Sequence, residues 1–101
     1  MEQEEFAQRM IQLRYAKNVS ARDMSLSLGQ SSSYINGIEN GAGFPSMTTF
    51  FYICDYFGIT PAEFFDTSIP APGKLRELLD AAKGLSNEQL DRLIAFIKSM
   101  K

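Results

Sequence analysis

The chain has 101 residues, 45% of them apolar and 22% charged, which is ordinary for one globular domain, and its net charge is −2. No apolar stretch approaches the roughly 20 residues that span a membrane, and the acidic start MEQEEF has no apolar segment behind it, so neither a membrane helix nor a signal peptide is predicted. Histidine is absent and Cys54 stands alone, which removes the commonest general base and metal ligand and excludes an internal disulfide. We therefore expect a cytoplasmic protein that is not an enzyme, holds no metal or cofactor, and shows no evident small-molecule ligand.

The first two predicted helices lie before Gly29. The first should end at Lys17, because Asn18 tolerates the left-handed backbone that ends helices. Ser20 is expected to cap the second, which should run to about Leu28. One face of the first helix carries Phe6, Met10, Leu13 and Lys17, with the basic residues Arg9 and Arg14 beside it. In the second helix Ser20 and Asp23 form a predicted capping box, and Val19 and Met24 form the hydrophobic staple.

A short polar helix should follow a glycine-containing turn of about three residues. Its sequence, SSSYINGIENG (31–41), suggests a cap at Ser31 and an end near Asn40, with Ile35 and Ile38 facing the core. Ser25 is small at the point where the two helices must approach closely. Gly37 costs about 1 kcal/mol of helix propensity relative to alanine, which indicates either a close backbone approach or a position under little constraint.

Two further helices are predicted after the loop at residues 41–45. Ser46 should cap the first of them. Thr60, Pro61 and Glu63 form a strong helix start, with a cap, a proline in the first turn and a capping box. The expected apolar face of the fourth helix consists of Met47, Phe50, Ile53, Cys54 and Phe57. In the fifth helix Ile59 and Phe64 form the hydrophobic staple. Cys54 is accordingly interpreted as a small core residue and not as a nucleophile.

The stretch TSIPAPG (67–73) predicts a linker, because prolines and glycine resist regular structure. A helical hairpin is expected over residues 74–101, with its turn at Gly84 and a capping box in LSNEQL (85–90). Its two apolar stripes exceed what one hairpin can bury, which favours a dimer interface, while the alternative is that the hairpin folds back over Tyr52 and Tyr56. The stripes are Leu75, Leu78, Leu79 and Ala82, then Leu90, Leu93, Ile94, Ile97 and Met100, and the seven predicted interface residues are Leu75, Leu78, Leu79, Leu90, Leu93, Ile94 and Ile97.

Residues 6–66 resemble the Cro/phage-repressor-like, or XRE-type, helix-turn-helix family. Four segments carry the resemblance, and they are RMIQLRYAKNVS (9–20), ARDMSLSLGQSSSYINGIENG (21–41), PSMTTFF (45–51) and FGITPAEFF (57–65). The resemblance implies an all-α fold in which a five-helix DNA-binding bundle (residues 1–66) precedes the C-terminal hairpin. It also implies that the second helix of the motif lies in the major groove of double-stranded DNA.

The resemblance also assigns roles to individual positions. Base-reading places of the family fall on Ser32, Ser33 and Gly37, with Asn36 nearby. Phosphate-contacting places fall on Ser20, Ala21, Arg22, Tyr34 and Asn40. Arg14 and Glu39 match a pair that bridges the first and third helices, and we interpret this pair as structural.

The net charge of residues 1–66 is the main argument against DNA binding. Residues 1–66 carry four basic and eight acidic side chains, a net charge of −4, whereas residues 67–101 carry six basic and four acidic ones. DNA-binding domains usually have a basic footprint. The sequence thus predicts a sequence-specific transcriptional regulator that binds operator DNA as a homodimer, and leaves open an antitoxin-like or adaptor module on the same fold with little DNA affinity.

Overall fold

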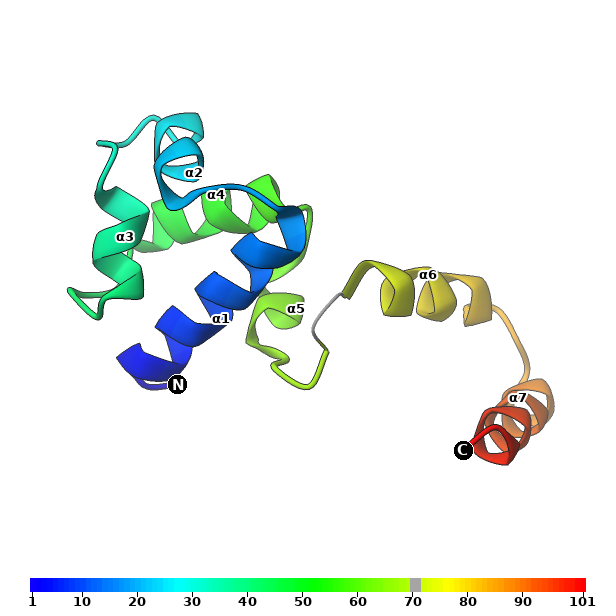
Figure 1. Ribbon diagram of the computed structural model, residues 1–101. Coiled ribbons are helices and arrows are strands. Elements are labelled where there is room, and N and C mark those ends of the chain that lie inside the picture. The colour runs from blue at the N-terminus through cyan, green and yellow to red at the C-terminus, as the bar shows by residue number, and fades with distance from the viewer. Residues whose placement is uncertain (70–71) are drawn as a thin grey trace.

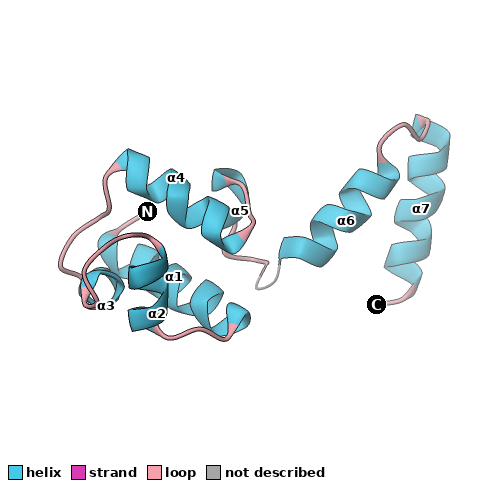
Figure 2. Ribbon diagram, turned by 90° about the horizontal axis from the view of Figure 1, so that it is seen from above, coloured by secondary structure: helices cyan, strands magenta, loops and turns pink. Residues whose placement is uncertain are grey.

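The computed structural model describes residues 1–69 and 72–101, and it is all-helical over these residues (Figures 1 and 2). Residues 70 and 71, which belong to the predicted linker, lie outside the described residues. The helices are α1 (Gln3–Lys17), α2 (Ala21–Ser27), α3 (Tyr34–Glu39), α4 (Met47–Phe57), α5 (Pro61–Phe65), α6 (Pro72–Ala82) and α7 (Asn87–Ser99). The predicted all-α fold class is confirmed, with α1–α5 forming a bundle that we call the head and α6–α7 forming the hairpin.

The helix ends are set by the local signals that the sequence carries. Asn18 adopts the left-handed conformation with φ 59° and ends α1. Ser46 accepts from the Thr49 amide at the start of α4, and both halves of the Thr60–Glu63 capping box are formed. The Ser86–Gln89 box of α7 is formed in the same way. At α2 only half of the expected box is present, since Ser20 accepts from the Asp23 amide and the reciprocal bond is not formed.

The core of the head comes from the apolar faces that helical spacing predicts. Its buried members are Phe6, Met10, Leu13, Met24, Ile35, Ile38, Phe50, Ile53, Cys54 and Phe64. Burial raises the pKa of the Cys54 thiol to about 11, with the Asp55 carboxylate adding to the shift, so this thiol is an inert core group. Met47 was expected on the core face of α4, but its side chain is 65% exposed because it occupies the first turn of the helix, at the edge of the core.

Arg9 is the main surprise in the head, because the sequence placed it beside the apolar face and the structure buries it. The side chain is only 2% exposed. Its guanidinium donates to the carbonyl oxygens of Phe64 (2.6 Å), Glu63 (2.7 Å) and Ile69 (3.0 Å), and to the Gln12 amide oxygen. One buried cation thereby ties the middle of α1 to the C-terminal end of the head.

The hairpin leaves the head and extends away from it, and the molecule measures 51 × 23 × 23 Å (Figures 1 and 2). The linker prediction of 67–73 was too long, since α6 already begins at Pro72, where a proline suits the first helical turn. The hairpin does not fold back over Tyr52, whose side chain is 57% exposed. Tyr56 is instead covered in part by Lys17, whose ammonium lies 4.9 Å from the ring centre.

Candidate nucleic-acid interface

The helix-turn-helix unit is formed by α2, the turn at residues 28–33 and α3. Gly29 has φ +73°, a conformation that favours glycine, and its amide donates to the Leu26 carbonyl as α2 ends. The α2 and α3 helices pack directly against each other (Figure 1). The predicted motif is therefore present, with a longer turn than the sequence suggested.

Ser25 joins the two helices of the motif through its hydroxyl group. This side chain is fully buried; its oxygen donates to the Ala21 carbonyl (2.7 Å) and accepts from the Ile35 amide (3.0 Å). The start of α3 is thus capped from within α2. The sequence identified Ser25 as small but missed this capping role, because a serine inside a helix gives no signal of a partner ten residues away.

The start of α3 corrects the expected cap at Ser31. The helix begins at Tyr34, the Tyr34 amide donates to the Ser31 carbonyl, and Ser33 makes no side-chain capping bond. Ser32 and Ser33 consequently lie in the turn before α3 instead of in its first helical turn. Both side chains are exposed, and neither hydroxyl group caps α3.

The predicted DNA-contacting residues lie on α2, the turn and α3 or, for Ser20 and Asn40, at the caps of these helices, and each has at least part of its surface exposed. Ser20 and Arg22 flank the start of α2, and Ala21 is linked by Ser25 to the start of α3. The exposed members are Ser20, Arg22, Ser32, Ser33, Asn36 and Asn40, and the partly exposed ones are Ala21, Tyr34 and Gly37. The buried Ile35 and Ile38 fix which side of α3 carries Asn36 and Asn40.

The expected pair of Arg14 and Glu39 is present as a bidentate ion pair. The nitrogen–oxygen distances are 2.7 and 2.8 Å, and the side chains are only 12% and 6% exposed. Arg14 also donates to the Val19 carbonyl (3.0 Å), and the hydrogen bond to Glu39 raises the pKa of the guanidinium. This contact joins α3 to α1 and pairs the charge of Arg14 within the protein.

Little positive charge remains for phosphate groups in the head. Of its four basic side chains, Arg9 is buried, Arg14 is paired and Lys17 lies over the Tyr56 ring. Arg22 alone, among residues 1–69, is an exposed cation on the motif itself. The four basic residues that the sequence places in the first two helices therefore do not act as one cluster.

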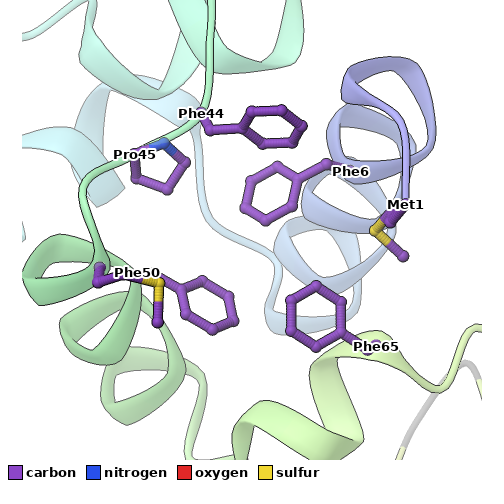
Figure 3. A pocket seen from close by; sticks show the side chains of 7 residues that line it. Met1, Phe6, Phe44, Pro45, Phe50 and Phe65 are labelled. Atoms are coloured by element: carbon purple, nitrogen blue, oxygen red, sulfur yellow. The ribbon is translucent and has the colours of Figure 1, made fainter.

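An apolar cavity of about 320 Å³ lies on another part of the head (Figure 3). It receives residues from α1, the loop after α3, α4 and α5, and none from α2 or α3. The lining residues are Met1, Phe6, Phe44, Pro45, Met47, Phe50 and Phe65. Figure 3 shows the rings of Phe6, Phe44, Phe50 and Phe65 around this hollow.

The described residues contain no group of three or more histidine, cysteine, aspartate or glutamate side chains placed to hold a metal ion. Within the same residues, no helix combines the length and the apolar character that crossing a membrane would require.

Comparison with known proteins now identifies the family. A family model described as helix-turn-helix (HTH_3) matches residues 10–64, which is more than half of the chain and includes the whole motif. No curated protein and no solved structure matches the chain. Proteins of this family are DNA-binding regulators and are generally not enzymes. The chain belongs to the Cro/phage-repressor-like, XRE-type family of helix-turn-helix proteins.

Proposed function

We propose that this protein is a cytoplasmic transcriptional regulator that binds a specific operator as a homodimer through the turn before α3 and the exposed side of α3. The observation that carries the proposal is the polar, exposed surface formed by Ser32, Ser33 and Asn36, whose position is fixed by contacts of α3 with α2 and α1. Ser25 fixes the start of α3, and the Arg14–Glu39 pair fixes its end. Such rigid support favours readout, because a reading helix must keep its place in the groove.

The chemistry of this surface suits hydrogen bonding more than charge attraction. Serine hydroxyl groups can bond to either kind of base edge, and asparagine can bond to adenine through two atoms. Tyr34, Asn40 and the start of α2 from Ser20 to Arg22 would then contact the DNA backbone and fix the register. Because Arg22 is the free cation on the motif, we expect few phosphate charges to be neutralised by the head.

Removing the serine hydroxyl groups tests this assignment. Ser32→Ala and Ser33→Ala should each weaken binding to the selected operator by about 0.5–1.5 kcal/mol, the net value of one ordinary hydrogen bond. Fluorescence anisotropy with a labelled duplex measures the loss. Ser68→Ala is the control, because Ser68 is an exposed serine outside the motif whose hydroxyl group donates to the Asp66 carboxylate. Unchanged operator affinity in the Ser32/Ser33 double alanine variant would remove these residues from the interface.

Gly37 offers a separate test, because the structure leaves room for a side chain there. A Cβ atom would meet only the Ala42 Cβ, at 4.0 Å, and the glycine is not in the left-handed region. Gly37→Ala should therefore stabilise the fold by up to about 1 kcal/mol through helix propensity. If DNA approaches this position closely, the same variant should bind operator several-fold more weakly. A more stable variant with full affinity would instead show that Gly37 lies away from the duplex.

The hairpin supports the proposed dimer. No described side chain of α6 or α7 is fully buried, and both predicted stripes keep large exposed apolar groups. Phe96, which is not a member of the predicted stripes, is 61% exposed and widens the apolar surface of α7 beside Met100. Apolar surface of this extent is typical of an interface. A dimer also suits the function, because two reading helices about 34 Å apart reach successive major grooves.

Shortening the chain tests the dimer. A chain ending at Ile69 keeps the carbonyl that binds Arg9 and removes the hairpin. Light scattering should show a dimer for the full chain and a folded monomer for the shortened one. Leu78→Glu and Ile94→Glu in the full chain should also give monomers, since both side chains are exposed members of the stripes and neither lines the crevice between α5 and α6. A full chain that is monomeric at tens of micromolar, or a shortened chain that stays dimeric, would contradict the assignment.

The second candidate function is an antitoxin-like or adaptor module with little DNA affinity. The observation that favours it is the charge of the head. Residues 1–66 carry eight acidic side chains, of which only Glu39 and Glu63 are paired with arginines, and the motif has one exposed cation, Arg22. Such a surface repels the DNA backbone at long range. Binding of random duplex DNA at low salt separates the two functions, because a regulator retains measurable non-specific affinity and the adaptor binds much more weakly.

A further inference from the structure

Arg76 makes the polar contact of the hairpin with the head. Arg76 lies in the second turn of α6, and its guanidinium makes a bidentate ion pair with the Glu63 carboxylate, with 2.9 Å between Nε and Oε2 and a second bond from Nη2 to Oε1. The same Nη2 donates to the Gly58 carbonyl (2.8 Å). Arg76 therefore contacts both α5 and the residue that ends α4.

The partners of Arg76 are themselves fixed within the head. The Glu63 carboxylate accepts from the Thr60 amide in the capping box (2.8 Å), and the Glu63 carbonyl accepts from buried Arg9. Gly58 is the left-handed residue that ends α4. A bidentate guanidinium–carboxylate contact defines direction as well as distance. Arg76 thus binds a rigid corner of the head, and its contact constrains the angle at which α6 leaves that corner.

This ion pair differs in kind from the others in the hairpin. The pairs Lys74–Glu77, Lys83–Asp80 and Arg92–Glu88 each lie within one helix, and every side chain in them is more than half exposed. The Arg76 and Glu63 side chains are 38% and 18% exposed. Hydrogen bonding from Arg76 lowers the pKa of Glu63 to about 2, so both groups stay charged at any pH used for DNA binding.

Apolar packing alone leaves the junction between head and hairpin incompletely filled. A crevice of about 180 Å³ remains between α5 and α6, lined in part by Ala62, Ile69, Leu75 and Leu79. A loosely packed apolar contact permits several angles between its two sides, whereas a bidentate ion pair favours one. The direction of α6 is therefore set chiefly by the polar contact.

We propose that Arg76 is a positioning residue that sets the angle between the head and the hairpin and so determines which spacing of operator half-sites the dimer accepts. This rests on the proposed function, since the hairpins join the two heads in that dimer. A fixed angle places the two α3 helices at one separation, and half-site spacing follows directly from that separation. Loss of the ion pair should broaden the accepted spacings without changing the bases that are read.

The experiment uses the full chain with Arg76→Gln and Glu63→Gln, each of which removes the ion pair. Glutamine at position 63 can still close the capping box, so α5 should keep its start. Arg92→Gln is the matched control, because it breaks an exposed pair within α7. Each protein is tested against duplexes carrying two copies of the selected half-site at a series of separations, and against a single half-site.

The wild-type chain and Arg92→Gln should prefer one separation. Arg76→Gln and Glu63→Gln should bind the optimal duplex several-fold more weakly and the neighbouring separations about equally, with unchanged affinity for the single half-site. Nitrogen-15 relaxation supplies a readout without DNA: head and hairpin should tumble together in the wild-type chain and less coherently in Arg76→Gln. Wild-type spacing preference and tumbling in both variants would overturn the role of Arg76 and leave the proposed function intact. A wild-type chain that binds no duplex would overturn both proposals.

Discussion

Replacement of Arg9 by alanine is expected to lower the free energy of unfolding by about 2–4 kcal/mol. Of the single substitutions proposed for this chain, it should cause the largest loss of stability. The guanidinium is nearly inaccessible to solvent and donates hydrogen bonds to three backbone carbonyl groups, those of Glu63, Phe64 and Ile69. Without it these acceptors lose their partner inside the protein, and the removed side chain also leaves a cavity beside α1.

Thermal or urea unfolding followed by circular dichroism measures this change. For a chain of this size, each kcal/mol corresponds to about 4–8 °C in Tm, so the shift should exceed about 8 °C. Arg92→Ala is the control, since its ion pair is exposed and should contribute less than about 0.5 kcal/mol. Equal melting of Arg9→Ala and the wild-type chain would mean that the buried contacts of Arg9 do not hold the C-terminal end of the head.

Arg14→Ala is expected to cost about 2–3 kcal/mol of stability, whether or not DNA is present. The substitution leaves the carboxylate of Glu39, 6% exposed, without its cation. Removing one partner of a buried ion pair is costly because the remaining charge stays desolvated, and we discount the usual cost slightly because Arg14 keeps some exposure.

Paired measurements separate the structural role of Arg14 from a direct DNA contact. Unfolding should show the loss in the free protein, and Glu39→Gln should destabilise the fold in the same direction. The free energy of operator binding, measured well below the melting temperature, should change by less than the free energy of unfolding. If Arg14→Ala melted like the wild-type chain and lost DNA binding, Arg14 would be a phosphate ligand instead of a support for α3.

The head was predictable from sequence because its signals are local. Apolar spacing located the helices, and side-chain caps such as Ser46 and Thr60 located their starts. The family resemblance supplied the pairing of Arg14 with Glu39, which lie 25 residues apart, and the structure confirms their contact. Spacing on a helix cannot by itself reveal such a partner.

The failures concern residues whose partners are distant in the chain. Arg9 looks like an ordinary charged residue at the edge of a helical face, and its burial depends on carbonyl groups more than 50 residues away. Ser31 looks like a cap, but α3 starts at Tyr34 because Ser25 already satisfies the Ile35 amide. Arg76 gave no signal, since its role depends on the angle at which the hairpin meets the head.

The free charge and the exposed hydroxyl groups of the head together indicate how it would recognise DNA. With Arg9 buried and Arg14 paired, the head has less free positive charge than its sequence suggests. With Ser32 and Ser33 in the turn before α3, their hydroxyl groups are exposed and serve no helix cap. Recognition would therefore depend on hydrogen bonds from the turn and α3, and dimerisation through the hairpin would bring a second head to the second half-site.

Recovery of genomic DNA bound to the 101-residue chain tests the central claim most directly, because it asks whether the protein binds specific sites and reveals their sequence. The proposed function predicts a small set of enriched sites that share two related half-sites in inverted orientation, as a symmetric dimer requires. The Ser32/Ser33 double alanine variant should recover these sites less efficiently. Recovery of no enriched sequence by the wild-type protein, at low as well as moderate salt, would contradict the account and favour the adaptor function.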